Sequence, residues 1–451
     1  MTATAVAQPS VALEVRRWLS LAMVAVLPLH TVFVRGWIAW KPFLVVLVIV
    51  VGIDVADGLR RRRWPWDPWV SGAAAVFLAT VGAGWFVSGF HGRFLRLSLA
   101  LGVGIAVMLV VARTIEEPGM SDRVLRVVFW SAAVLGVTGF VLAIVAVGGV
   151  GASAIETVDG LPLVARVFKP AYLTEGFVAV TNWHQDPGYA AAWTNLWASL
   201  AVVAAARGRG SRRWWLDGAV VGSLAVATFM TMSRTGWMGF AVAMAITSVV
   251  LVVKDRVPAG RIGRVAIAAA GVAVVMVGFL AAVDRVGVGA DLATEVAFRL
   301  DQNVSLDAGD AGGLGADLGE VDTRRVVWPW YVEAFRTHPI LGIGLGTGWA
   351  LEGVQEPHNL GLELLGETGI VGFVGFALLA GTVVRRGRGT LGAIALAVAL
   401  VAAFTQTVLF EPTLWFAAGL YIGGRGSMSA HRHDLEDPID RGSDRLPTPG
   451  E

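Results

Sequence analysis

The sequence contains no cysteine and little charge. The lack of cysteine among its 451 residues excludes disulfide bonds, iron–sulfur clusters and thiol nucleophiles together. Only 16% of the residues are charged, whereas 55% are hydrophobic, and the mean hydropathy is +0.66. Because about a quarter of the residues of a soluble domain are charged, this chain cannot bury its apolar surface in its own core. Lipid must be the solvent for much of it.

The sequence also has few of the patterns that hold metals, nucleotides or nucleic acids. Its seven histidines are scattered, and it shows no phosphate-binding loop and no acidic cluster with metal-ligand spacing. We therefore expect no metal and no cofactor. The pI near 9.2 would suit nucleic-acid binding in a soluble protein. Most of the basic residues, however, lie in short loops between apolar runs, where orientation in a membrane explains them better, so we expect no nucleic-acid partner.

Twelve apolar segments are candidate membrane helices, since a spanning helix needs about 20 mostly apolar residues. They cover residues 18–34, 38–56, 69–88, 94–112, 127–147, 188–206, 214–232, 236–253, 265–283, 358–384, 390–409 and 412–424. Each must be helical, because lipid satisfies no backbone hydrogen bonds. The sequence therefore predicts an all-α integral membrane protein with about twelve transmembrane helices.

The basic residues predict the side of the membrane on which each loop lies. With the N-terminus inside, 24 of the 36 Lys and Arg residues fall on the inner side, as the positive-inside rule requires. We expect a cytoplasmic N-terminal segment (1–17), a polytopic membrane domain (18–424) and a disordered cytoplasmic tail (425–451). This orientation places two long loops, about 148–187 and 284–357, on the outer side of the membrane. Loops of this length are often functional.

A histidine opens the tenth apolar segment, in Glu356-Pro357-His358-Asn359-Leu360. Proline suits the first turn of a helix, which predicts that His358 lies at the outer N-terminus of this helix. The positive end of the helix dipole there favours a neutral imidazole that can accept a proton. On a regular helix Gly369 and Gly372 would share a stripe with His358 and let a neighbouring helix approach closely. The structural alternative is a histidine that only ends a helix at the membrane interface.

Two arginine sites lie on the same predicted face. Arg234 stands in the short connection between the seventh and eighth segments, at the outer membrane boundary, where a charge is costly unless it has a partner. Arg324 and Arg325 begin a predicted short amphipathic helix, which leads through the glycines of 342–346 back to His358. Arginine suits diphosphate because its planar guanidinium makes bidentate contacts. An interfacial anchor at Arg234 and local charge pairing at Arg324 and Arg325 are the structural alternatives.

The histidine segment resembles the signature of the bacterial O-antigen ligase/polymerase family of membrane glycan transferases. That signature is His, then Asn, Ser or Gln, nine residues, Gly, two residues and Gly. His358 and Asn359, followed by Gly369 and Gly372, match it in full at the start of a late span.

The arginines resemble the same family. Its members carry an arginine four residues before a leucine; Arg234 fits, although Met238 stands in place of leucine. A further family arginine stands four residues before a tryptophan in the large outer loop. That spacing selects Arg324, with Trp328, and leaves Arg325 as the alternative.

The resemblance implies a metal-independent transfer of a glycan from undecaprenyl diphosphate to an acceptor hydroxyl, on the outer face of the cytoplasmic membrane. His358 would be the general base, while Arg234 and either Arg324 or Arg325 would bind the diphosphate. The acceptor would be a glycan, a lipid or a protein, and membrane lipids are the remaining partners. Candidates for sugar contacts in the first long loop are Tyr172, Asn182, His184, Asp186 and Tyr189. A polymerase of lipid-linked repeat units that uses the same chemistry, and a transporter or flippase, remain alternatives.

Overall fold

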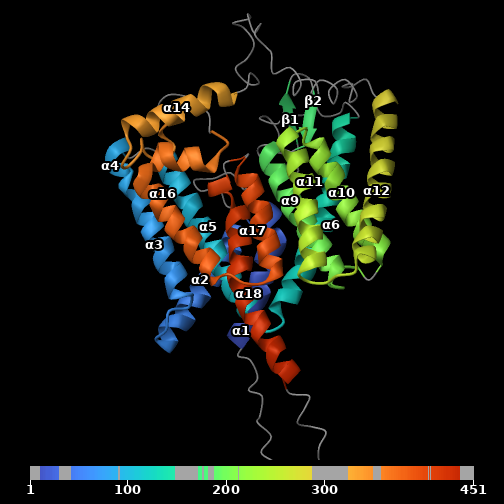
Figure 1. Ribbon diagram of the computed structural model, residues 1–451, viewed down its shortest axis with the longest axis horizontal. Coiled ribbons are helices and arrows are strands. Elements are labelled where there is room, and N and C mark those ends of the chain that lie inside the picture. The colour runs from blue at the N-terminus through green and yellow to red at the C-terminus, as the bar shows by residue number, and fades with distance from the viewer. Residues whose placement is uncertain are drawn as a thin grey trace, which may run out of the picture.

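The chain folds into a bundle of helices (Figure 1). The structure is a computed structural model that describes residues 11–29, 42–89, 92–147, 171–174, 177–180, 187–211, 213–286, 323–348, 357–404, 406 and 408–436. The helices that run along the bundle are α1 (Val11–Val26), α2 (Pro42–Arg61), α3 (Pro68–Ala83), α5 (Gly92–Glu116), α6 (Met120–Val147), α9 (Pro187–Ala206), α10 (Trp214–Met230), α11 (Arg234–Val253), α12 (Ala259–Val286), α16 (Leu360–Arg386), α17 (Thr390–Ala403) and α18 (Pro412–Glu436). The shorter helical elements are η1 (Leu27–Leu29), α4 (Trp85–Ser88) and η3 (Val408–Phe410).

A further helix and a pair of strands lie at the upper end of the bundle in Figure 1. Helix α14 (Thr323–Thr337) lies across this end, which confirms the helix predicted to begin at the paired arginines. Strands β1 (Ala171–Thr174) and β2 (Phe177–Val180) form an antiparallel hairpin. Apart from this short hairpin the described elements are helical, as the predicted all-α class requires; the valines and phenylalanine of β2 are residues that favour strands.

Eight helices in the described part of the chain are long and apolar enough to cross a membrane. They are α2, α3 continued by α4, α5, α6, α9, α11, α12 and α16. Each of the twelve predicted segments overlaps a helix, but α1, α10 and α17 have only 16, 17 and 14 residues. The chain is therefore a multi-pass helical membrane protein, and the number of twelve spans stays a prediction.

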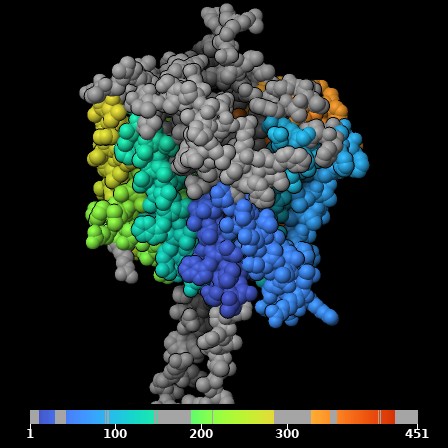
Figure 2. All heavy atoms as spheres, turned by 180° about the vertical axis from the view of Figure 1, so that it is seen from behind, coloured from blue at the N-terminus to red at the C-terminus, as the bar shows by residue number. Residues whose placement is uncertain are grey.

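The surface of the bundle is apolar where it faces outward. Its exposed side chains include Val45, Val48 and Ile49 of α2, Val134, Val137 and Val141 of α6, and Ile267, Val274 and Val275 of α12. Figure 2 shows this back face, with α1, α2 and α6 beside one another and α12 at its edge. Soluble monomers rarely expose contiguous apolar patches of this extent. In contrast, 94% of the apolar stretch of α9 is buried, so this helix forms the centre of the bundle.

Both ends of the described chain lie on one side of the bundle. Helix α1 begins, and α18 ends, at the lower end in Figure 1. The basic last turns of α2, α5 and α16 contain Arg60, Arg113 and Arg385, and these helices also end at the lower side (Figure 1). The arrangement is consistent with the predicted cytoplasmic position of both termini.

An ion-pair network joins α1, α2 and α5 near the lower end. Arg16 is 1% exposed and its Nε lies 2.5 Å from Asp54 Oδ1, while another nitrogen of its guanidinium pairs with Glu117. Arg113 Nη1 lies 3.2 Å from the same oxygen of Asp54. Buried charges are tolerated only when paired in this way. The sequence predicts that Arg16 flanks the membrane domain, but α1 begins at Val11, so Arg16 lies inside the bundle.

Small residues allow α5 and α18 to pack closely. A Cβ atom on Gly419 would lie 2.7 Å from the Met108 carbonyl oxygen, and one on Gly423 would lie 2.5 Å from the Ala112 carbonyl oxygen. Glycines four residues apart are a common device where membrane helices meet.

Helix α18 also continues beyond the predicted end of the last span. It reaches Glu436, so residues 425–436, predicted to be disordered, are helical. The helix ends just before Asp437-Pro438, where the residue ahead of a proline disfavours helical dihedrals.

Candidate functional site

Helix α16 is broken at Gly369, which joins two helical segments. Gly369 has φ 63° and ψ −167°, a conformation open essentially to glycine alone. A Cβ atom there would overlap the Ile340 carbonyl and lie 2.6 Å from the Gly342 nitrogen. The first segment lies across the upper end of the bundle and the second runs down through it (Figure 1).

The loop after α14 satisfies the backbone groups that the break leaves unpaired. Such groups must find other partners when they are buried. Four backbone hydrogen bonds cross between the loop and the break: Ile370 N to Pro339 O (2.9 Å), Val371 N to Ile340 O (3.1 Å), Ile343 N to Gly366 O (3.0 Å) and Gly344 N to Glu367 O (2.9 Å). The glycine-rich loop and the broken helix therefore form one interlocked unit.

The two signature glycines do not form the stripe that the sequence predicts. That prediction is wrong because it assumed a continuous helix, whereas Gly369 is the break itself. Gly372 faces its own helix: a Cβ atom there would overlap the Thr368 side chain, whose hydroxyl donates to the Leu364 carbonyl at 2.6 Å.

His358 directly precedes the capped start of α16. Asn359 is the N-cap, and its Oδ1 accepts a hydrogen bond from the Leu362 nitrogen at 3.0 Å. Pro357 therefore lies outside the helix, and the prediction that it occupies the first turn is wrong by about one turn. Asparagine is a strongly preferred N-cap residue, so the helix begins after Asn359 and not at Pro357. His358 itself has φ 48°, the left-handed region that a residue with a Cβ atom rarely adopts.

The imidazole of His358 is half-buried. Its Nδ1 atom is buried and makes no hydrogen bond within the described part of the chain. The carbonyl just before it is held, because Trp328 Nε1 of α14 donates to the Pro357 oxygen at 2.8 Å. A buried polar atom without a partner is uncommon and needs an explanation, such as a bound group or a catalytic role.

Helix α14 is fixed on α16 by Tyr331 and Glu367. Tyr331 is 1% exposed, and its hydroxyl donates to Glu367 Oε1 at 3.3 Å. The other oxygen of Glu367 accepts from the Gly346 nitrogen at 2.9 Å, which ties in the glycine-rich loop. Arg324 and Arg325 lie in the first turn of α14, and their side chains are outside the described part of the structure.

Arg234 is the first residue of α11, at the upper end of the bundle. The preceding Ser233 is the N-cap, and its Oγ accepts from the Gly236 nitrogen at 3.1 Å. Met232, just before the cap, has φ 52°. Helices α11 and α16 therefore start in the same way, with a left-handed residue followed by a side-chain cap. Helix α11 packs on α9 and α17, whereas α16 packs on α3, α14 and α18, so Arg234 and His358 belong to neighbouring groups of helices at the same end.

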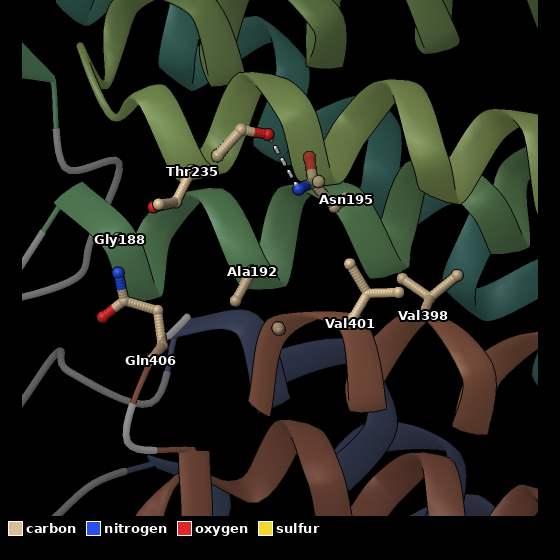
Figure 3. A pocket seen from close by; sticks show the side chains of 10 residues that line it. Gly188, Ala192, Asn195, Thr235, Val398, Val401 and Gln406 are labelled. Carbon is tan, nitrogen blue, oxygen red and sulfur yellow. Dashed lines mark hydrogen bonds between the residues drawn. The ribbon is translucent and has the colours of Figure 1, made fainter. Parts of the chain in front are cut away.

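A narrow pocket lies between α9, α11 and α17, beginning one residue after Arg234. Thr235 and Gln406 line one end, and Val398 and Val401 line the other, with Asn195 between them (Figure 3). The Asn195 side chain donates to the Gly236 carbonyl at 3.1 Å.

Gln406, like Asn195 and Thr235, is a polar residue of this pocket that sequence analysis missed. It is 8% exposed, and its Oε1 has no hydrogen-bond partner among the described residues. A Cβ atom on Gly188 would overlap its amide, so the glycine makes room for it. A lone glutamine near the end of an apolar segment gives no signal in the sequence, because only the fold brings it against α9 and α11.

The other predicted contacts lie mostly beyond the described residues. Asn182, His184 and Asp186 are among these, and the side chain of Tyr172 on β1 is also outside them. Tyr189 lies in the first turn of α9, next to the pocket-lining Gly188. Within the described residues no group of three or more His, Asp or Glu side chains could hold a metal ion.

One comparison with known proteins finds a match. The family model described as O-antigen ligase matches residues 219–377, about a third of the chain, and this segment contains Arg234, Trp328, His358 and both signature glycines. No curated protein matches the chain. The match confirms the resemblance predicted from the sequence: this membrane protein is similar to the O-antigen ligases, a family of glycan transferases.

Proposed function

We propose that the chain transfers a glycan from undecaprenyl diphosphate to an acceptor hydroxyl, on the outer face of the cytoplasmic membrane, with His358 as general base. The observation that carries this proposal is His358 itself. It occupies the histidine position of the family signature, in a strained backbone conformation, with a buried ring nitrogen that has no partner among the described residues. Strained residues cluster at functional sites, where the surroundings hold them in place.

The proposed reaction is a single displacement at the anomeric carbon. The acceptor hydroxyl loses its proton to the His358 imidazole while its oxygen forms a bond to the anomeric carbon. The bond from that carbon to the phosphate oxygen breaks, and its electron pair leaves with undecaprenyl diphosphate. A base within hydrogen-bond reach of the hydroxyl contributes roughly 100- to 10,000-fold to such a step.

Arg234 and Arg324, with Arg325 as the alternative to Arg324, bind the diphosphate in this proposal. Arg234 begins α11, so the positive end of the dipole of a long helix adds to its charge. Both sites would also stabilise the negative charge that grows on the leaving diphosphate. The pocket that begins beside Arg234 changes from polar to apolar along its length, as a site for the diphosphate end of an isoprenoid chain requires.

The experiment is a comparison of lipid-linked glycans in a strain that lacks the gene and carries wild type, His358→Ala or the control His338→Ala. His338 is an exposed histidine in the loop after α14, at the same end of the molecule. Polyprenyl-diphosphate glycans are extracted and their amounts and lengths measured by mass spectrometry.

We expect long lipid-linked chains to accumulate with His358→Ala and not with wild type or His338→Ala. Accumulation of single repeat units would identify a polymerase that uses the same base. Normal glycan pools with His358→Ala, in protein that is inserted and stable, would refute the proposed mechanism.

A further inference from the structure

We infer that Trp328 is a positioning residue for His358: its indole N–H holds the Pro357 carbonyl and thereby fixes the turn that carries the imidazole. The inference rests on the proposed function, because it concerns the base of that reaction.

The hydrogen bond holds the peptide group between Pro357 and His358. Trp328 Nε1 lies 2.8 Å from the Pro357 oxygen, and this oxygen belongs to the peptide group whose nitrogen is that of His358. On the other side, the next residue, Asn359, is held by the bond from the Leu362 nitrogen to its side chain. A left-handed conformation of a residue with a Cβ atom persists only where neighbouring groups hold it. His358 is therefore held from both sides, once by its own helix and once by α14.

The indole is a firm anchor because α14 is itself fixed on α16. Tyr331, three residues after Trp328, lies on a neighbouring part of the same helix face and donates to the buried Glu367. A Cβ atom on Gly366 would lie 2.6 Å from the Tyr331 ring, so the two helices meet closely at this point. Helix α14 also contains Arg324, one turn before Trp328. The bond thus ties the base to the helix that bears a proposed diphosphate-binding residue.

The alternative is a tryptophan that only anchors α14 at the membrane interface, as indole rings commonly do. Trp328 is 37% exposed, which suits such a role. The two roles differ in one respect: an interfacial anchor needs the ring, whereas positioning needs the N–H. Phenylalanine keeps the apolar ring and removes the N–H, so Trp328→Phe separates them.

The experiment measures steady-state transfer by the full-length protein in lipid vesicles, for wild type, Trp328→Phe, His358→Ala and the control Trp64→Phe. Trp64 also uses its indole N–H in one hydrogen bond, to Ser71 Oγ at 3.0 Å. That bond joins the loop between α2 and α3 to α3, at the opposite end of the bundle. For Trp328→Phe we expect kcat to fall about tenfold, because the free energy of one lost hydrogen bond corresponds to roughly this factor. We expect KM for the lipid-linked donor to stay within about twofold, because donor binding is retained.

A second readout follows the histidine directly. Diethyl pyrocarbonate modifies imidazole, and the modification rates of His358 and His338 are measured in the same sample by peptide mass spectrometry. We expect Trp328→Phe to raise the rate at His358 severalfold and to leave the rate at exposed His338 unchanged, since only the turn at His358 is released. Trp64→Phe should alter neither rate nor kcat.

Three outcomes would overturn the inference. If Trp328→Phe keeps the wild-type kcat and labelling rate while His358→Ala is inactive, the tryptophan does not position the base and the proposed function stands. If Trp328→Phe raises KM at unchanged kcat, the indole contacts substrate instead. If His358→Ala remains active, the proposed function fails and the inference falls with it. If the phenylalanine variant does not reach the membrane, Trp328→Tyr tests the same bond. Tyrosine keeps an aromatic ring, but its hydroxyl lies beyond the position of the indole nitrogen, so the bond to the Pro357 oxygen is lost.

Discussion

Replacing Gly369 by alanine tests whether the break in α16 is held as the structure shows. The φ of 63° and ψ of −167° at Gly369 cost alanine about 1–3 kcal/mol. The new Cβ atom would also press on the Ile340 carbonyl and displace the two hydrogen bonds from Ile370 and Val371 to the loop. At about 1 kcal/mol for each bond, the docked loop is destabilised by about 3–5 kcal/mol in total.

The chain itself provides a clean assay for this change, because it has no cysteine. A cysteine in place of Leu345, which is 1% exposed in the docked loop, reacts with a maleimide only when the loop opens. The predicted destabilisation corresponds to labelling that is roughly 100- to 4,000-fold faster in Gly369→Ala than in the parent.

The matched control is Gly381→Ala in the same background. Gly381 lies further along α16, where a Cβ atom would meet nothing within 4 Å. Alanine there should leave the labelling of a cysteine at position 345 unchanged and stabilise the helix by up to about 1 kcal/mol. Equal labelling rates in the Gly369→Ala and Gly381→Ala proteins would refute the interlocked loop and break.

Three further predictions concern the rest of the molecule. Asp54→Asn leaves the guanidinium of Arg16 buried without one of its two carboxylate partners, so the free energy of unfolding should fall by about 3–5 kcal/mol; an unchanged melting profile in detergent would contradict this. Glu333→Cys should react with a membrane-impermeant maleimide in intact cells and Arg61→Cys only after permeabilisation, since these exposed side chains lie at opposite ends of the bundle; the reverse pattern would invert the proposed orientation. Gly239→Leu should fill the pocket beside Arg234 and raise KM for the lipid-linked donor at least severalfold. An unchanged KM would show that the donor does not bind in this pocket.

The helices of the bundle could be predicted because each is a local apolar run. A stretch of about 20 apolar residues has few options other than a helix in lipid, and the predicted starts of α9, α10 and α11 lie within two residues of those observed. The candidate base could also be found, because the histidine signature and the arginines are short sequence patterns, and the family match spans all of them.

The remaining features could not be predicted because they depend on contacts between distant residues. Gly369 looks like an ordinary packing glycine until the loop at 339–346 supplies the partners that make a break possible. Arg16 looks like a flanking charge until Asp54, 38 residues away, pairs with it. Trp328 and Pro357 are likewise 29 residues apart, so nothing in their separate surroundings signals the bond between them.

The central claim is that His358 removes the proton from the acceptor in a glycan transfer. Its most direct test uses purified protein in lipid vesicles, with a polyprenyl-diphosphate-linked glycan and an acceptor, and measures the release of polyprenyl diphosphate over time. The account predicts acceptor-dependent release by wild type and by His338→Ala, and at least a 100-fold slower release by His358→Ala, roughly the share of the rate that a general base supplies. Release by His358→Ala at the wild-type rate would contradict it.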